Sequence, residues 1–345
     1  MPAESPQQSA LRQILNSLQT PSVRALAWSV LSAPLVTCTT ETKHLISVLP
    51  TLALGGVNNI IDFLHKEDQA PSRLHQHLAQ RSSHFLGPYF ESLWAYFFHH
   101  TDRYQVTAQN LQIHHQGKTL GEFDFILWDT VAKQHIHVEL AAKFYLQIRN
   151  RGVHNKYFPN STMSWIGPNQ IDRLDLKIAA LLDKQLIMAE HPVAKIQLSK
   201  LGVSTLTTRT LLKGMLFPEI IDIDDFLAYC LKYRHQNHCG WLSRSNFSNW
   251  MNEPESTRPG TWFAPDKLDW LAPLYHSEQR EYSDSKLNSK KMQRFLDSIE
   301  AENRPKMLAH IATTEPCQTT PLSGMHQELF RLFVTPDGWP AKFLI

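Results

Sequence analysis

The sequence predicts an α/β fold of the mixed α+β kind, in which helices pack against a mixed β-sheet. Two observations indicate this class. An aromatic segment with helical spacing, Phe85–His99, is followed by three short segments in which residues alternate as they do in strands. A second helical segment, Pro168–Leu186, and an apolar strand-like segment, Leu206–Phe217, come next. The order helix, three strands, helix and strand therefore defines the predicted core.

The chain of 345 residues is long enough to bury a large core and to form two domains or one domain with extensions. Its 42% hydrophobic and 19% charged residues are typical of a globular protein, and its net charge of +2 is too small to indicate a nucleic-acid partner by itself. Four scattered cysteines without a CxxC pair argue against a zinc ribbon and a disulfide scaffold. Since no apolar run reaches about 18–20 residues and the start lacks a signal-peptide pattern, we expect a cytoplasmic protein with no membrane partner.

Three regions follow from changes in composition along the chain. Residues 1–80 are expected to be an N-terminal helical region, because Val23–Leu31 has a helical apolar face and two glycines, Gly55 and Gly56, mark a break. Residues 81–220 hold the predicted core. Residues 221–345 are expected to form a helical and β extension packed on the core, with a tryptophan-rich stretch that holds Trp241, Trp250, Trp262 and Trp270. An exposed aromatic surface in that stretch would suit a protein partner.

The central strands are predicted over Leu120–Trp128 and Gln134–Leu146, joined by a short turn that favours an antiparallel pair. Asn110–His115 precedes them as a third strand of the same meander. Because residues two apart share a face of a strand, Phe123 and Phe125 are expected on one face of the first central strand.

Three ionisable residues are expected to converge on the other face of this strand pair. Asp124 comes from the first strand, Glu139 and Lys143 come from the second, and His137 has the same parity as Glu139. Two carboxylates and an ammonium on apolar strands are costly unless they pair with one another or bind a metal ion. From the residues alone, both a buried salt-bridge network and a metal site fit this pattern.

The helix predicted over Phe85–His99 contains a single acidic residue, Glu91. Gly87 and Ala95 lie on the same helical face and would let that face approach a sheet closely. Glu91 is therefore a candidate third acid of the site, and the alternative is a glutamate favoured by the helix dipole or paired with an arginine. In the second helix the charged residues, Lys177 among them, are expected mostly to face solvent, with a few reaching the site.

Two stretches without acidic residues, Leu140–Ile171 and His191–Pro218, lie on either side of the second helix. In the first of them basic side chains alternate with aromatic ones, a combination that suits a phosphate backbone and unstacked bases. The alternative is a solvated loop with ordinary surface lysines. The candidate nucleic-acid-binding residues in the two stretches are Arg149, Arg151, Lys156, Lys195, Arg209 and Lys213.

The segment GEFD around Asp124, followed by a strand that carries Glu139 in VELAAK, resembles the PD-(D/E)XK phosphodiesterase superfamily. That resemblance implies the restriction-endonuclease-like fold with its αβββαβ core. It also implies that Asp124 and Glu139 are ligands of Mg²⁺ or Mn²⁺, with Glu91 as a further acid from the first helix. The usual lysine position holds Ala141, and Lys143 lies one strand repeat further on.

A wider set of motifs is similar to a bacterial family, the domain-of-unknown-function family 1853. These motifs are VRALAW, FESLW, GEFDF, VELAAKFYL, WIGPN and LLKGMLF. They extend over most of the chain, and they imply a fold without naming a substrate.

The superfamily resemblance implies a metal-dependent nuclease that hydrolyses phosphodiester bonds of DNA or RNA. A divalent ion would screen the anionic phosphate and supply hydroxide near neutral pH. Lys143 would stabilise the charge that develops on the phosphate. Because Ala141 stands where the lysine is expected, the alternative is a catalytically degenerate nuclease-fold protein that binds nucleic acid or a protein partner.

Overall fold

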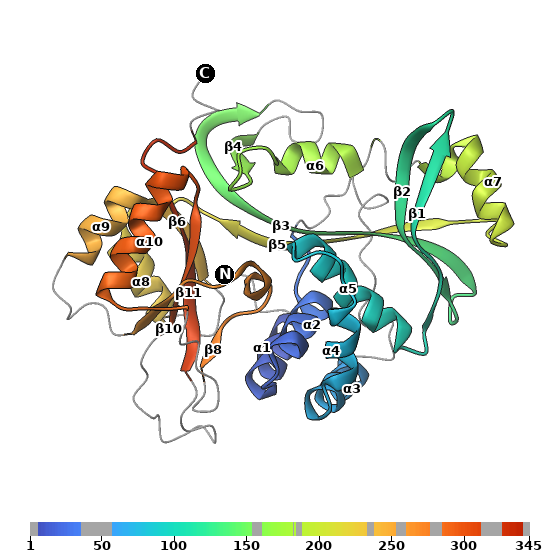
Figure 1. Ribbon diagram of the computed structural model, residues 1–345, viewed down its shortest axis with the longest axis horizontal. Helices are drawn as coiled ribbons and strands as arrows, with labels where there is room; N and C mark the ends of the chain where they lie inside the picture. The colour runs from blue at the N-terminus through green and yellow to red at the C-terminus, as the bar shows by residue number, and fades with distance from the viewer. Residues whose placement is uncertain are drawn as a thin grey trace. The chain divides into compact units, whose positions relative to one another are not determined.

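The computed structural model describes residues 6–35, 57–153, 161–181, 183, 188–232, 238–252, 260–276, 285–311 and 326–340. The chain divides into two compact units. The first comprises Met1–Lys143 and Lys177–Gly214, and the second comprises Phe144–Leu176 and Met215–Ile345. Helices occur together with antiparallel and parallel strands, so the predicted mixed α+β class is confirmed (Figure 1).

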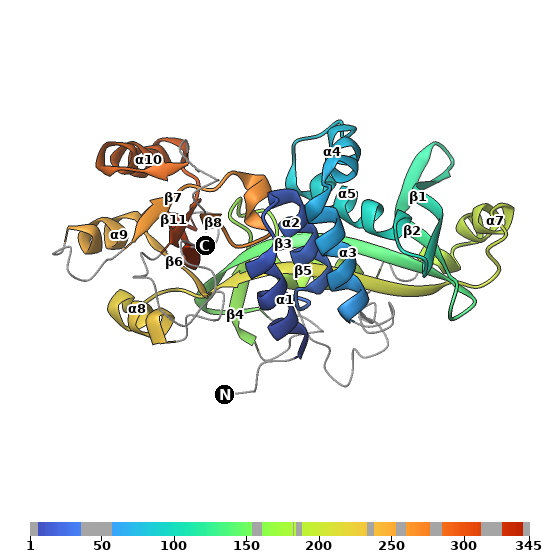
Figure 2. The ribbon, with the colours of Figure 1, turned by 90° about the horizontal axis from the view of Figure 1, so that it is seen from below.

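A group of helices opens the first unit, and the helices lie side by side in both ribbon views (Figures 1 and 2). The rings of Trp94, Phe97 and Phe98 of the last helix, α5, contact one another in tilted or edge-to-face arrangements, and the Trp94 and Phe97 rings are 5.7 Å apart and nearly perpendicular. Phe98 also contacts Phe125 of the sheet edge to face at 5.2 Å, so aromatic packing holds the helix against the strands. The helices are α1 (Pro6–Ser17), α2 (Pro21–Leu31), α3 (Val57–Gln69), α4 (Ser72–Ala79) and α5 (Leu86–His99).

The sheet of the first unit is an antiparallel meander of β1 (Tyr104–His115), β2 (Lys118–Asp129) and β3 (Gln134–Val153). Gln116 and Gly117 join β1 to β2 with φ angles of 49° and 76°, as a two-residue hairpin turn requires. The predicted pairing of the two central strands is confirmed, because β2 and β3 pair from Asp129↔Gln134 to Phe125↔Val138.

The turn between β2 and β3 is held by Asp129. Its carboxylate accepts the backbone amides of Val131 and Ala132 at 3.0 and 2.9 Å and the Arg103 guanidinium at 2.8 Å. These bonds hold the Asp129 pKa below its ordinary value, although burial alone would raise it. The same turn residues that mark the break in the sequence therefore fix the register of the central pair.

Helix α7 (Pro192–Lys200) follows the short helix η3 (Met188–Glu190) and packs on the hairpin of β1 and β2, beside which both ribbon views place it (Figures 1 and 2). Ala194 and Leu198 of α7 enter one apolar cluster with Phe123 and Ile126 of β2. Strand β5 (Thr207–Phe217) pairs with β3.

Gly214 brings β5 very close to β3. Its φ angle is 146°, and a Cβ atom at this position would overlap the carbonyl oxygen of Lys143. At the other end of β5, the Thr207 hydroxyl lies 3.4 Å from the Gln134 side-chain oxygen. These two contacts show that β5 runs in the same direction as β3, and that only glycine fits where they meet.

The second helix of the core begins later than predicted. Helix α6 is Leu174–Ala180, because Asn169 closes a turn by accepting the Ile171 amide at 3.1 Å and Gln170 has a φ of 58°. Strand β4 (Ser161–Ile166), for which no strand is predicted from the sequence, pairs with the end of β3 in the second unit.

The remainder of the second unit is a mixed sheet in the order β6-β11-β10-β7-β9, with β8 beside β11. Only the pairing of β6 with β11 is parallel among the described pairs of this sheet. Its strands are β6 (His238–Ser243), β7 (Thr261–Phe263), β8 (Tyr275–His276), β9 (Lys286–Leu287), β10 (Lys306–Ile311) and β11 (His326–Thr335). The helices around it are α8 (Ile223–Lys232), α9 (Arg244–Met251), α10 (Ser289–Glu302) and the short η5 (Lys267–Trp270).

Of the four tryptophans in the tryptophan-rich stretch, three lie inside this unit and Trp270 is half-buried. Trp250 and Trp262 are buried in its core with their rings 5.9 Å apart, and Trp241 is buried as well. Trp241 also donates from its indole nitrogen to the Gln147 carbonyl oxygen at 2.8 Å. These aromatic side chains therefore stabilise the second unit from within and do not form an exposed patch.

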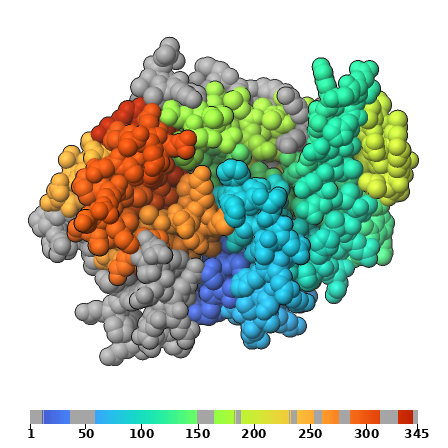
Figure 3. Space-filling model, in the orientation of Figure 1, coloured from blue at the N-terminus to red at the C-terminus, as the bar shows by residue number. Residues whose placement is uncertain are grey.

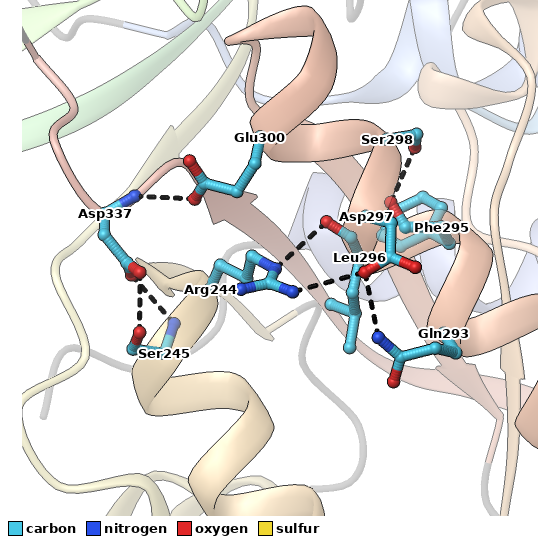
Figure 4. A network of polar contacts seen from close by, with 9 residues as sticks. All are labelled: Arg244, Ser245, Gln293, Phe295, Leu296, Asp297, Ser298, Glu300 and Asp337. Carbon is cyan, nitrogen blue, oxygen red and sulfur yellow. Dashed lines mark hydrogen bonds and ion pairs between the residues drawn. The ribbon is translucent and has the colours of Figure 1, made fainter.

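A polar network ties α9, α10 and the segment after β11 together (Figure 4). Asp337 accepts the amide and hydroxyl of Ser245 at 2.8 and 2.6 Å, and its own amide donates to Glu300 at 3.0 Å. Arg244 bonds to the Leu296 carbonyl oxygen and to Asp297. The network joins elements of the second unit that are distant in the chain and holds α9 and α10 in place.

Candidate functional site

The candidate site begins where β2 and β3 separate. Their ladder reaches Phe125↔Val138, and the next amide of β3 that points toward β2, that of Leu140, donates to the Asp124 carboxylate at 2.7 Å. A side chain thus takes the place of a backbone carbonyl in the ladder. This bond holds one carboxylate oxygen of Asp124 against the Glu139–Leu140 peptide.

The regular alternation predicted for β2 is wrong at this point. Phe123 packs with Ile126 in the apolar cluster under α7, whereas Phe125 contacts Phe98 of α5. Phe123 and Phe125 therefore do not share a face, since two residues with opposite parity, Phe123 and Ile126, do. The irregularity falls on Asp124 and Phe125, and it lets the Asp124 side chain reach the backbone of β3.

The carboxyl groups of Asp124, Glu139 and Glu91 influence one another. Burial, followed by the charge of Glu139, raises the pKa of Asp124 to about 7, while the Leu140 amide opposes the rise. Burial raises the pKa of Glu91 as well, with further contributions from Glu122 and Glu139. The three acids expected from the sequence, each from a different element, therefore lie close enough to act on one another by charge.

Two further residues, Glu122 and His137, lie near these carboxyl groups. Glu122 of β2, which the sequence analysis did not place in the site, accepts the Gln112 amide at 2.9 Å and acts on Glu91 by its charge. His137 is fully buried, with its Nε2 atom 3.5 Å from an oxygen of the buried Glu139. The Phe123 ring stands perpendicular to the His137 imidazole at 4.8 Å. His137 thus flanks Glu139, as its parity in the sequence indicates.

The cation that lowers the Asp124 pKa is Lys177 of α6, which is half-buried. Sequence periodicity alone could not single out Lys177, because the face of a helix depends on the residue at which it begins. Lys143 is half-buried too, and its backbone lies against Gly214. The site therefore has two candidate lysines, Lys143 from β3 and Lys177 from α6.

The predicted basic residues of the first unit do not form one surface at the carboxylates. Lys213 is buried and donates to the Ser32 carbonyl oxygen at the end of α2, and burial lowers its pKa to about 7. Its assignment to a nucleic-acid surface is wrong, because it lies in a stretch of β5, residues 210–213, in which every residue is buried whichever face it points to. Lys195 is exposed and pairs with Glu190 at 2.7 Å.

The charge of Arg209 acts on Tyr104 at the start of β1, which pairs with Asp129 at the end of β2. The side chains of Arg149 and Arg151 and the whole of Lys156 lie outside the described residues.

The carboxylate oxygens of Asp124, Glu139 and Glu91 are donors of the kind that Mg²⁺ and Mn²⁺ prefer. Among the residues that the structure describes, no three His, Cys, Asp or Glu side chains are grouped in a way that could hold a metal ion. Mg²⁺, however, keeps several water molecules and commonly binds protein through one or two carboxylates. Asp124 and Glu139 supply two such groups from neighbouring strands, and their mutual repulsion favours a cation between them. The pair therefore fits an ion that is bound largely through water, with Glu91 outside its direct ligands.

Comparisons with known proteins place the chain in a family. No curated protein and no solved structure matches the chain. In the described residues, no helix is both long enough and apolar enough to cross a membrane. A family match covers residues 24–335, which include most of both units of the structure. The chain therefore belongs to the family described as Domain of unknown function (DUF1853).

Proposed function

We propose that the chain is a PD-(D/E)XK-type nuclease that hydrolyses phosphodiester bonds of nucleic acid with Mg²⁺ or Mn²⁺. The observation that carries this proposal is the Asp124 carboxylate, which is held beside the Glu139–Leu140 peptide and has a pKa raised by burial and by Glu139. Two acids that repel each other on neighbouring strands are stabilised by a divalent cation. The order of α5, three antiparallel strands, α6 and β5 supports the same superfamily.

Each residue of the site has a chemical role in this proposal. Asp124 and Glu139 would hold the ion, the Leu140 amide fixes the orientation of the Asp124 carboxylate, and the buried His137 lies beside Glu139. When bound, the ion screens the phosphate charge and makes a bound water more acidic. Glu91, whose raised pKa favours proton uptake, suits the transfer of a proton through water.

A lysine would stabilise the charge that develops on the phosphate oxygens. Lys177 is favoured for this role because its charge already acts on Asp124. Lys143 is the alternative, since it follows the acid on the same strand. A helix-borne lysine would also explain how Ala141 can stand at the usual lysine position.

A second candidate function keeps the fold without the chemistry. In the described part of the chain, no cluster of three metal-binding side chains exists, and this observation favours a degenerate nuclease-fold protein that binds nucleic acid without cutting it. The two candidates differ in a single property, which is cleavage that depends on a divalent ion.

A cleavage assay tests the proposal. Purified chain is incubated with single- and double-stranded DNA and RNA in the presence of Mg²⁺, Mn²⁺ or a chelator. We expect cleavage with the metals only, and its loss in Asp124→Asn and in Glu139→Gln, which keep the shape of each side chain and remove its charge. Asp225→Asn, an exposed position on α8, is the matched control and should cleave normally. Binding without cleavage under all conditions would support the degenerate protein instead.

A further inference from the structure

A polar pocket of about 320 Å³ lies in the first unit between α4, α5 and β1. Figure 3 shows the cyan surface of α4 and α5 next to the teal surface of the β1–β2 hairpin. The volume is at the lower end of the range for small-molecule sites, so the pocket has room for one nucleotide and not for a duplex. Its wall includes the polar residues Arg81, Ser82, Ser83, Glu91, Gln109 and Asn110.

The pocket adjoins the carboxylate site along the sheet. Gln109 pairs with Phe125 and Leu111 pairs with Phe123, so Asn110 is the residue of β1 that lies opposite Asp124. Asn110 adopts a left-handed conformation with φ of 51° inside the strand, an uncommon conformation that concentrates at functional sites. Glu91 belongs both to the pocket wall and to the group of acids.

Arg81 is a positioned cation in this wall. Its Nε atom donates to the Leu78 carbonyl oxygen at 2.9 Å, and its guanidinium lies 4.6 Å from the centroid of the Tyr89 ring. These contacts fix the plane of the group. The Nη1 atom is buried and has no hydrogen-bond partner among the described residues. The Arg81 side chain as a whole is half-buried and lines the pocket, and a phosphate oxygen is the acceptor that a guanidinium binds best.

The other polar side chains supply neutral hydrogen-bonding groups. Ser82 and Ser83 carry hydroxyl groups next to Arg81, and such groups commonly contact phosphate and sugar. Gln109 and Asn110 carry side-chain amides, which can bind base edges on both donor and acceptor atoms. The phosphate-binding and base-binding groups thus lie on different walls, Arg81 before α5 and the amides on β1.

We propose that this pocket binds one nucleotide of the substrate strand next to the bond that is cut, with its phosphate on Arg81 and its base at Gln109 and Asn110. The inference rests on the proposed nuclease function for the identity of the strand. Binding of the nucleotide itself does not need catalysis, so the two can be tested separately.

The test is calorimetric titration of the whole chain with deoxyadenosine 5′-monophosphate, with deoxyadenosine and with inorganic phosphate, all in the presence of EDTA. We expect the monophosphate to bind at least tenfold more tightly than the nucleoside. Arg81→Met should abolish that difference, because the guanidinium accounts for the phosphate contact. Arg294→Met, at an exposed position on α10, should bind as the wild type does. Equal binding of monophosphate and nucleoside, or an undiminished preference in Arg81→Met, would overturn the inference.

A second variant keeps the test decisive if Arg81→Met fails to fold, which its melting temperature would reveal. Asn110→Gly accepts the left-handed backbone and removes only the amide. It should weaken binding of the monophosphate severalfold and leave binding of inorganic phosphate unchanged, and unchanged monophosphate binding would contradict the base contact. Nucleotide binding by a chain that does not cleave would overturn the nuclease proposal alone. Cleavage by a chain whose pocket binds no monophosphate would overturn this inference alone.

Discussion

Replacement of Asp124 by asparagine should stabilise the metal-free protein at alkaline pH and not at acid pH. The pKa of Asp124 rises from its ordinary value of 3.8 to about 7 in the folded chain, owing first to burial and then to Glu139. A group with a higher pKa in the folded state contributes stability below its unfolded pKa, and this stability is lost as the pH rises through its folded pKa. Wild-type protein should therefore lose stability between about pH 4 and pH 7.

The size of the effect follows from the shift. Three pKa units correspond to about 4 kcal/mol, and the partial solvent contact of Asp124 reduces the expectation to about 2–4 kcal/mol. Asparagine has no proton to lose at these pH values, and its carbonyl oxygen can still accept the Leu140 amide, so the variant should not show this loss.

Urea unfolding in EDTA, at pH values from 4.5 to 8, measures the prediction. The difference in unfolding free energy between Asp124→Asn and wild type should grow with pH, while other titrating groups cancel. A difference that stays constant over this range would mean that Asp124 is ionised without penalty in the folded chain, and that its pKa is not raised. Added Mg²⁺ should reverse the order at pH 8 by stabilising the wild type alone.

Three further outcomes follow from single contacts. Lys213→Met should raise the free energy of unfolding by up to about 5 kcal/mol below pH 7, because burial lowers the Lys213 pKa to about 7. The gain should vanish toward pH 10.5. Urea titrations at pH 7 and 10 would show this difference, and a loss of stability at pH 7 would contradict it. Gly214→Ala should destabilise the chain by more than about 3 kcal/mol, since its Cβ would overlap the Lys143 carbonyl oxygen; a melting temperature equal to that of the wild type would rule this out. Lys177→Met should lower the cleavage rate more than Lys143→Met does while Mg²⁺ binding persists, and the reverse order in single-turnover rates would assign the catalytic role to Lys143.

Local patterns in the sequence were sufficient for the order of the core elements. The aromatic helix and the pairing of the central strands are strong signals, because their periodicities extend over many residues and Asp129 forms the turn. The sequence also indicates that Glu91, Asp124 and Glu139 act on one another by charge, although the path by which Asp124 reaches β3 is not the one that strand parity predicts.

Three features that the sequence does not predict depend on contacts between residues that lie outside any local pattern. The break in alternation at Asp124 arises because its side chain replaces a carbonyl in the ladder, and no local pattern encodes that exchange. Helix α6 starts late because the side chain of Asn169 binds a nearby amide, and the start decides where Lys177 points. As a lysine in a stretch without acidic residues, Lys213 is expected on the surface. In the folded chain it lies on β5 and donates to a carbonyl oxygen at the end of α2.

Asp124 and Glu139 are proposed to form one site for a divalent cation. Electron paramagnetic resonance of Mn²⁺ detects such a site, because bound Mn²⁺ loses the six-line signal of the free ion. We expect wild-type chain to remove one equivalent of free Mn²⁺ at submillimolar concentration, Asp124→Asn and Glu139→Gln each to abolish this binding, and Lys177→Met to retain it. A free-ion signal that is undiminished by wild-type protein at millimolar Mn²⁺ would mean that the two carboxylates do not form a cation site.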